Sequence, residues 1–230
     1  MEQIRTFSDS RLEGHCIYCG NEPETKEHVP SKILLDKPFP ENLPVVQACA
    51  KCNQGFSLDE EYLACLLECA LCGTTEPELL KRGKISKILI RKPKLRAKLE
   101  KSKKDNDGQI HFQSEIERIR NVIKKLAQGH AKFENSETQF DEPYQVWFQP
   151  ITLMTEDESD KFFGNEELSL VPEIGSRAFQ RTMLDEQGIP RAYWKEVQEN
   201  NYSYSIAHVA SGLRVRMLIW NYLVGEVIWE

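Results

Sequence analysis

The N-terminal quarter of this 230-residue chain is organised by Cys16-Ile17-Tyr18-Cys19 and Cys49-Ala50-Lys51-Cys52, two C-x-x-C pairs. Two residues between thiols let a tight turn direct both sulfurs at one ion, and two such turns supply the four thiolates of a tetrahedral zinc site. The paired spacing is a strong signal for such a site. Because four protein ligands leave no open position for water or substrate, we expect a structural zinc, and any chemistry must come from other residues.

The interval between the pairs is informative in itself. It holds 29 residues between Cys19 and Cys49, more than the ~15–20 of a simple four-cysteine ribbon. A strand, a loop and a second strand would fill it. The chain opens with MEQIRTFSDS, which lacks the apolar segment of an export signal. We therefore expect a cytoplasmic protein with reduced thiols, and disfavour a disulfide framework.

Between and after the pairs stand Glu27-His28-Val29-Pro30, Asn42-Leu43 and Asn53. With the cysteines, these motifs closely resemble the HNH, or ββα-metal, nuclease family in its four-cysteine form, over about a quarter of the chain. The resemblance implies an endonuclease that hydrolyses phosphodiester bonds in DNA, with His28 as the general base. It also implies that Glu27 and Asn53 hold a catalytic divalent ion, magnesium or manganese, and that Asn42 steadies the loop and the histidine.

These residue types suit the implied chemistry. Phosphodiester cleavage needs a nucleophilic water and relief of the charge that develops on the leaving 3′ oxygen, which one imidazole and one hard cation can provide. The Glu27 carboxylate and the Asn53 amide offer the oxygen donors that magnesium prefers. Because successive side chains of a strand point to opposite faces, Glu27 and His28 are expected to flank a shared phosphate. The chain departs from the family pattern after Asn53, where Gln54-Gly55-Phe56 replaces the basic residue of many members.

The next segment predicts a helix over 57–72, because the capping box Ser57-Leu58-Asp59-Glu60 precedes apolar residues at helical spacing. Three further cysteines, Cys65, Cys69 and Cys72, fall inside this helix. Their i, i+4 and C-x-x-C spacings are compatible with a second zinc site. We prefer burial in an apolar core, which is the commoner place for cysteine.

Basic residues are concentrated in one segment of a chain whose net charge is -6. The segment 81–104 holds 12 basic residues and one acid, so the remainder of the chain carries -17. Such a segment can bind phosphates through counterion release without reading base sequence. A solvated face or linker is the alternative. The candidate nucleic-acid contacts are Lys92, Lys94, Arg96 and Lys98.

Later elements follow from periodicity. We expect a turn at 105–108, a helix from 116 that ends near Gly129, and His130 as a capping or surface residue. A strand at 144–148, an acid-rich loop at 156–167 and a short helix over 177–187 come next. Alternation predicts a C-terminal sheet with His208 packed in it. This C-terminal segment resembles the tails of uncharacterised bacterial and phage HNH proteins. Its strands are expected at 202–208, 213–219 and 223–229.

Together these observations predict an α+β protein in three parts. They are an N-terminal ββα-metal, treble-clef-like element with a structural zinc (1–76), a basic helical segment (77–135), and an α+β domain of unknown role that ends in an antiparallel sheet (136–230). DNA is the expected partner on the resemblance alone, and RNA stays open. A homodimer or a protein partner bound through the C-terminal domain also stays open, and no apolar run is long enough to cross a membrane. The alternative function is a non-catalytic zinc module that binds nucleic acid or a protein.

Overall fold

The computed structural model describes residues 6–7, 13–106, 109–184 and 186–230. It confirms a mixed helical and sheet protein whose C-terminal strands form an antiparallel sheet. The chain divides into two compact units, one made of residues 1–56 and 123–230 and the other of residues 57–122. The three-part division by sequence motif stays a prediction. No helix in the described ranges is both long and apolar enough to cross a membrane.

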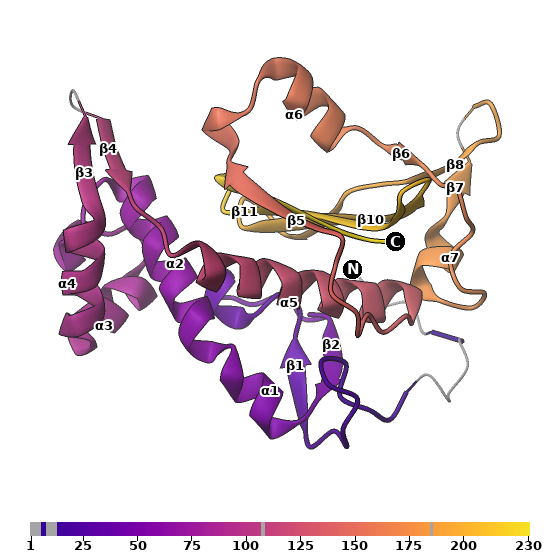
Figure 1. Cartoon of the computed structure of the whole chain (residues 1–230), viewed down its shortest axis with the longest axis horizontal. Coiled ribbons are helices and arrows are strands. Elements are labelled where there is room, and N and C mark those ends of the chain that lie inside the picture. The colour runs from indigo at the N-terminus through magenta and orange to yellow at the C-terminus, as the bar shows by residue number, and fades with distance from the viewer. Residues whose placement is uncertain (1–5, 8–12, 107–108, 185) are drawn as a thin grey trace. The chain divides into compact units, whose positions relative to one another are not determined.

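The first unit contains a short hairpin followed by a helix (Figure 1). Strand β1 (Thr25–His28) pairs antiparallel with β2 (Val45–Ala48), and a 3-10 turn (Lys32–Leu34) lies in the loop between them. Helix α1 (Ala50–Gly55) begins directly after Cys49. The strand, loop and strand predicted between the two cysteine pairs are therefore present.

A five-stranded antiparallel sheet forms the C-terminal half of this unit, in the order β5-β12-β11-β10-β9. Residues on both faces of its central strands are buried, and Tyr202, Tyr204 and Met217 share one of these faces. The turn between β10 and β11 requires glycine, because a Cβ atom on Gly212 would lie 1.9 Å from the Trp229 carbonyl oxygen. The strands are β5 (Gln145–Pro150), β9 (Lys195–Gln198), β10 (Tyr202–Val209), β11 (Gly212–Ile219) and β12 (Leu223–Trp229). The three predicted C-terminal strands are confirmed.

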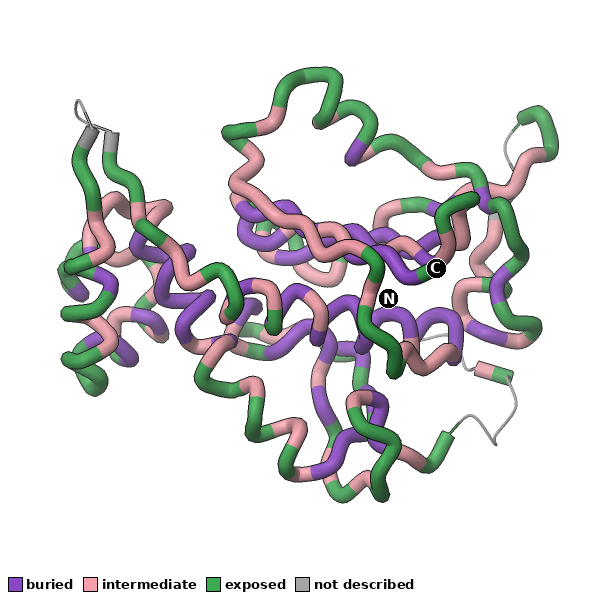
Figure 2. The backbone as a smooth tube through the Cα atoms, in the orientation of Figure 1, coloured by how far each residue is buried: buried purple, intermediate pink, exposed green. Residues whose placement is uncertain are grey.

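Helix α5 (Ile116–Asn135) continues six residues beyond Gly129, so the predicted helix end is wrong. From Ile123 onward it belongs to the first unit and packs on the sheet face that carries Tyr202, Tyr204 and Met217. Gly225 permits this approach, because a Cβ atom there would lie 3.1 Å from Cδ1 of Ile123. Figure 2 shows the central strands and this part of the helix as buried.

His130 is fully buried, which corrects its predicted place at a helix end or on the surface. Its Nε2 atom lies 2.8 Å from the Tyr202 hydroxyl, and its ring stacks on that of Tyr204 with centroids 3.7 Å apart. Burial lowers the pKa of His130 to about 3. The expectation failed because glycine after an apolar repeat usually ends a helix, whereas Gly129 here serves a close packing contact.

The acid-rich segment predicted as a loop contains helix α6 (Glu156–Phe163), so that prediction is wrong. Thr155 and Glu158 form a complete capping box, and this local signal is present in the sequence. The helix predicted over 177–187 is shorter, because α7 covers only Arg177–Arg181. A small sheet of β6 (Glu166–Glu167), β8 (Pro190–Ala192) and β7 (Met183–Leu184) completes the unit. His208 lies in β10 as predicted and forms an ion pair of 2.9 Å with Glu137 if protonated.

The second unit contains the predicted helix α2 (Ser57–Cys72) and the basic segment. The segment is largely helical, and its first helix ends at Arg91 before Pro93 begins the second. Its ion pairs include one of 2.8 Å between Arg82 and Glu68. The remaining elements are a 3-10 turn (Pro77–Leu79), α3 (Gly83–Arg91), α4 (Pro93–Ser102), β3 (Lys103–Asn106) and β4 (Gln109–Phe112). Half of the predicted turn, at 107–108, lies outside the described residues.

Candidate metal centre and adjoining residues

The side chains of Cys16, Cys19, Cys49 and Cys52 converge in the first unit. One sulfur from each lies within 4.8 Å of all the others. The sulfurs of Cys19 and Cys49 are 3.7 Å apart, close to the ~3.8 Å that a tetrahedral ion with Zn–S bonds of ~2.3 Å imposes. The cluster can therefore hold a metal ion, and four thiolates suit zinc.

Local backbone geometry forms this cluster. The Cys49 sulfur accepts a hydrogen bond of 3.4 Å from the Cys52 amide, which makes Cys49 both a ligand and the N-cap of α1. Gly20 has φ +76°, which lets the chain turn back immediately after Cys19. Burial alone would raise the pKa of the Cys16 thiol, but backbone hydrogen bonds, first that from Cys49, lower it to about 7. Burial raises the pKa of the Cys52 thiol in the same cluster, so Cys16 is the one of these two closer to the thiolate that a metal requires.

The three cysteines of α2 do not join a second group of this kind among the described residues. Cys65 and Cys69 are buried, and burial raises the pKa of both thiols, that of Cys69 to about 12. A protonated, buried thiol behaves as a small apolar side chain. The core interpretation of these cysteines is therefore the better one.

His28 is the last residue of β1 and is half-buried, directly opposite Val45 on β2. Burial, and secondly the charge of Lys32, lower the pKa of His28 below its ordinary 6.5. The imidazole is therefore neutral at pH 7, the form that can accept a proton. Strand alternation places it on the same face of the hairpin as Lys26, opposite to Glu27.

Glu27 is buried and held by a lysine from α5. The Nζ atom of Lys125 lies 2.7 Å from Oε1 of Glu27 and 3.1 Å from the Ser31 hydroxyl oxygen. The side chain of Lys125 is 1% exposed and that of Glu27 is 9% exposed. The same ammonium lies 5.4 Å above the Phe56 ring. A divalent ion does not fit beside this carboxylate, because a cation already occupies that position and little solvent reaches it.

The other two residues implied by the resemblance have different surroundings. The Asn53 side chain donates a hydrogen bond of 2.9 Å from Nδ2 to the Thr25 hydroxyl oxygen, which ties α1 to β1. Asn42 is exposed in the loop between the strands and lines a cavity of about 530 Å³. His28 does not line that cavity. The roles of Asn42 and Asn53 in catalysis stay predictions.

A second cavity, of about 330 Å³, lies beside the hairpin, and His28 is not among the residues that line it. Val45, the cross-strand partner of His28, lines it together with Lys26. Lys132 and Arg177 also line it, so three cations face one carboxylate, that of Glu13. Sequence patterns did not single out these cations, because 26, 132 and 177 are far apart in the chain.

In the second unit, most of the four predicted nucleic-acid contacts take part in ion pairs. Lys92 lies 2.6 Å from Glu61, and both Arg96 and Lys98 pair with carboxylates, those of Glu76 and Glu115. These pairs are solvent-exposed in part and contribute little to stability. Binding of phosphate by these residues would compete with the carboxylates.

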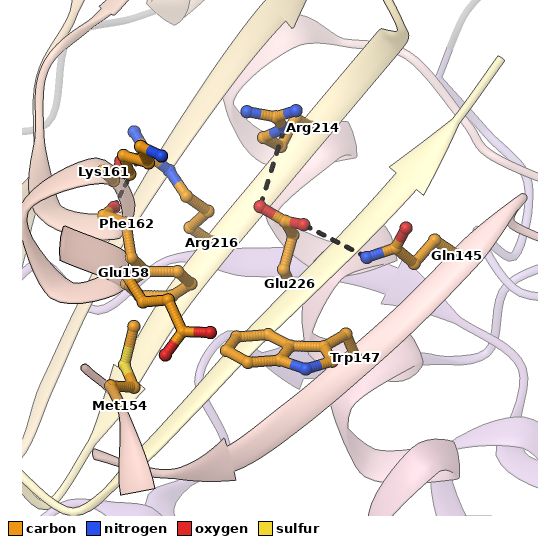
Figure 3. A pocket seen from close by; sticks show the side chains of 9 residues that line it. All are labelled: Gln145, Trp147, Met154, Glu158, Lys161, Phe162, Arg214, Arg216 and Glu226. Carbon is orange, nitrogen blue, oxygen red and sulfur yellow. Dashed lines mark hydrogen bonds and ion pairs between the residues drawn. The ribbon is translucent and has the colours of Figure 1, made fainter. Parts of the chain in front are cut away.

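Figure 3 shows a third cavity, of about 260 Å³, on the sheet face opposite to α5. Arg216 is 1% exposed and donates a hydrogen bond of 3.0 Å to the Gly164 carbonyl, at the end of α6. Arg214 lies 3.6 Å from Glu226, and burial raises the pKa of Glu226. Cations and carboxylates offset one another here, and none of the predicted site residues lines this cavity.

Comparison with protein-family models, curated proteins and solved structures finds no match to this chain.

Proposed function

We propose that this chain is a zinc-stabilised endonuclease that hydrolyses phosphodiester bonds, with DNA as its substrate and His28 as its general base. The carrying observation is that His28, whose pKa is lowered, lies on the same strand face as Lys26, which lines a cavity with two further cations, Lys132 and Arg177. The motif resemblance of the sequence supports the same residue.

Four side chains carry out the proposed reaction, one as the general base and three as phosphate-binding cations. The His28 imidazole accepts a proton from a water molecule, which then attacks phosphorus. The bond to the 3′ oxygen breaks, and that oxygen takes a proton from solvent. Lys26, Lys132 and Arg177 bind the phosphate oxygens and stabilise the negative charge that grows on them.

The cysteine cluster has a supporting role in this proposal. A zinc ion bound to four thiolates fixes Cys49 at the start of α1 and Cys19 beside it, which holds the hairpin strands in register. Because the site is closed, the metal contributes folding free energy and no chemistry.

A non-catalytic zinc module that binds nucleic acid or a protein is the second candidate. The burial of Glu27 against Lys125 favours it, because the carboxylate implied as a metal ligand is not open to solvent. The two candidates share the zinc and the basic cavity, and only turnover separates them.

Nicking of supercoiled plasmid by the purified, zinc-loaded chain tests the proposal. Assays run in metal-free buffer and with added magnesium or manganese, and His28→Ala is compared with His111→Ala, which removes an exposed histidine of the second unit. We expect His28→Ala to lower turnover by ~10²-fold or more and His111→Ala to leave it unchanged.

Equal loss in both variants, or equal activity in the wild type and His28→Ala, would remove His28 from the mechanism. DNA binding without any cleavage would establish the non-catalytic candidate.

A further inference from the structure

We infer that the cation beside Glu27 in this protein is the ammonium of Lys125 and that no divalent ion binds there. One consequence rests on the proposed function: if the chain cleaves DNA, the cleavage needs no added divalent ion. The binding statement itself is tested without a nuclease assay.

The first observation is the completeness of the ion pair. Lys125 has three donors, and its ammonium contacts the Glu27 carboxylate at 2.7 Å and the Ser31 hydroxyl at 3.1 Å. The Ser31 hydroxyl in turn lies 3.5 Å from the same carboxylate. A carboxylate, a hydroxyl and an aromatic face are the groups that stabilise a buried ammonium.

The second observation is how α5 positions Lys125. Lys125 and Gly129 are four residues apart and so lie on the same face of the helix. A Cβ atom on Gly129 would lie 2.6 Å from Cγ2 of Val29, so the helix backbone is in direct contact with the chain just after β1. This approach places Lys125, one turn earlier, against Glu27.

The third observation is the lack of room for a hydrated ion. Magnesium and manganese keep several water ligands and require near-octahedral space. The exposed fractions of the Lys125 and Glu27 side chains, 1% and 9%, leave no such space. In addition, an ammonium at 2.7 Å from the carboxylate repels a divalent ion at the same position by like charge.

The test is a titration of manganese into the zinc-loaded full chain, with free Mn²⁺ followed by electron paramagnetic resonance. Wild type and Glu27→Gln are compared in metal-free buffer. We expect the two titrations to coincide, because Glu27 does not take part in ion binding. Manganese binding by the wild type that Glu27→Gln abolishes would overturn the inference.

Lys125→Met supplies an independent measurement. Loss of the ammonium removes the ion pair of a buried carboxylate, and we expect Tm to fall by roughly 10 °C. Because Met fills nearly the volume of Lys and the site has no room for a hydrated ion, millimolar magnesium or manganese should raise the Tm of neither Lys125→Met nor the wild type. The double variant Glu27→Gln/Lys125→Met is the matched control and should not respond to either ion.

If Lys125→Met does not fold, the comparison of wild type with Glu27→Gln still decides the question. A wild-type Tm that rises with magnesium, and does so only while Glu27 is present, would contradict the inference. If the wild type cleaves no DNA under any condition, the proposed function fails while the manganese titration keeps its meaning.

Discussion

Gly129 of α5 contacts Val29 so closely that a Cβ atom at this position would lie 2.6 Å from one methyl carbon of the valine and 2.9 Å from the other. A glycine inside a helix costs about 1 kcal/mol relative to alanine. Its presence here is explained by the backbone contact that it permits between α5 and the chain after β1.

Gly129→Ala should therefore destabilise the protein despite its higher helix propensity. The added methyl gains about 1 kcal/mol of propensity, but overpacking of a buried contact costs about 1–3 kcal/mol. We expect a net loss of about 1 kcal/mol in the free energy of unfolding by chemical denaturation. Gly83→Ala is the control, because nothing lies within 4 Å of a Cβ atom there. Val29→Ala should partly rescue Gly129→Ala, and purely additive effects would argue against the contact.

Elemental analysis should find one zinc ion per chain, bound by the cluster that contains Cys49. Cys49→Ser should lose the metal and lower Tm, because zinc binding contributes folding free energy in such sites. Cys72→Ser, in α2, is the matched control and should keep both the zinc and its stability. Zinc-free protein with an unaltered Tm would contradict the assignment, and two ions per chain would indicate a site among the α2 cysteines.

The burial of His130 predicts a dependence of stability on pH. Its folded pKa of about 3 lies below the ordinary 6.5, so the unfolded chain binds more protons between these values and stability rises with pH there. Between pH 7.5 and 5.5 this histidine should lower the free energy of unfolding by about 1.4 kcal/mol. His130→Gln cannot titrate, and denaturant titrations at the two pH values should show a smaller loss for this variant. An equal loss in both proteins would assign the effect to other groups.

Phosphate binding should distinguish the cavity beside the hairpin from the basic segment. The double variant Lys26→Gln/Lys132→Gln should lower the rate of cleavage. It should also flatten the slope of log affinity for DNA against log salt concentration, by roughly 0.9 for each phosphate that the variant no longer neutralises. The comparison is a chain neutralised at Lys92, Lys94, Arg96 and Lys98, which should weaken binding across sequences without lowering turnover on bound DNA. An unchanged salt slope in that chain would identify the basic segment as a solvated surface.

Truncation after Asn135 removes the whole C-terminal sheet. From the sequence, a chain that ends near residue 135 is expected to retain zinc but to lose substrate selectivity, stability or both. The packing of α5 on the sheet predicts a loss of stability in particular. Truncation would separate Ile123 and His130 from their partners Gly225 and Tyr202. We expect a Tm well below that of the full chain by circular dichroism. A Tm like that of the full chain would show that the hairpin and α5 form a core of their own.

The sequence by itself determined the features that depend on local spacing. Cysteines three residues apart reach one ion through a single turn, which is why the cluster of Cys16, Cys19, Cys49 and Cys52 was predictable. Helix α2 and the three C-terminal strands followed from the spacing of their apolar residues. Helix α6 was predictable in the same local way, since the capping box of Thr155 and Glu158 marks its start.

Only the tertiary structure decided which distant side chains meet. Lys125 reads as one more charge in a basic helix, yet it lies on the buried stripe and meets Glu27, 98 positions earlier in the chain. His130 is buried because the sheet covers it, and its ring contacts the Tyr202 hydroxyl. Arg216 is buried beside α6, where it donates a hydrogen bond to the Phe162 carbonyl. Periodicity predicts which face of an element is buried. The partner of a buried charge depends instead on how elements that are far apart in the sequence pack together. The same limit applies to the cation beside Glu27, which the motif alone implied to be a metal.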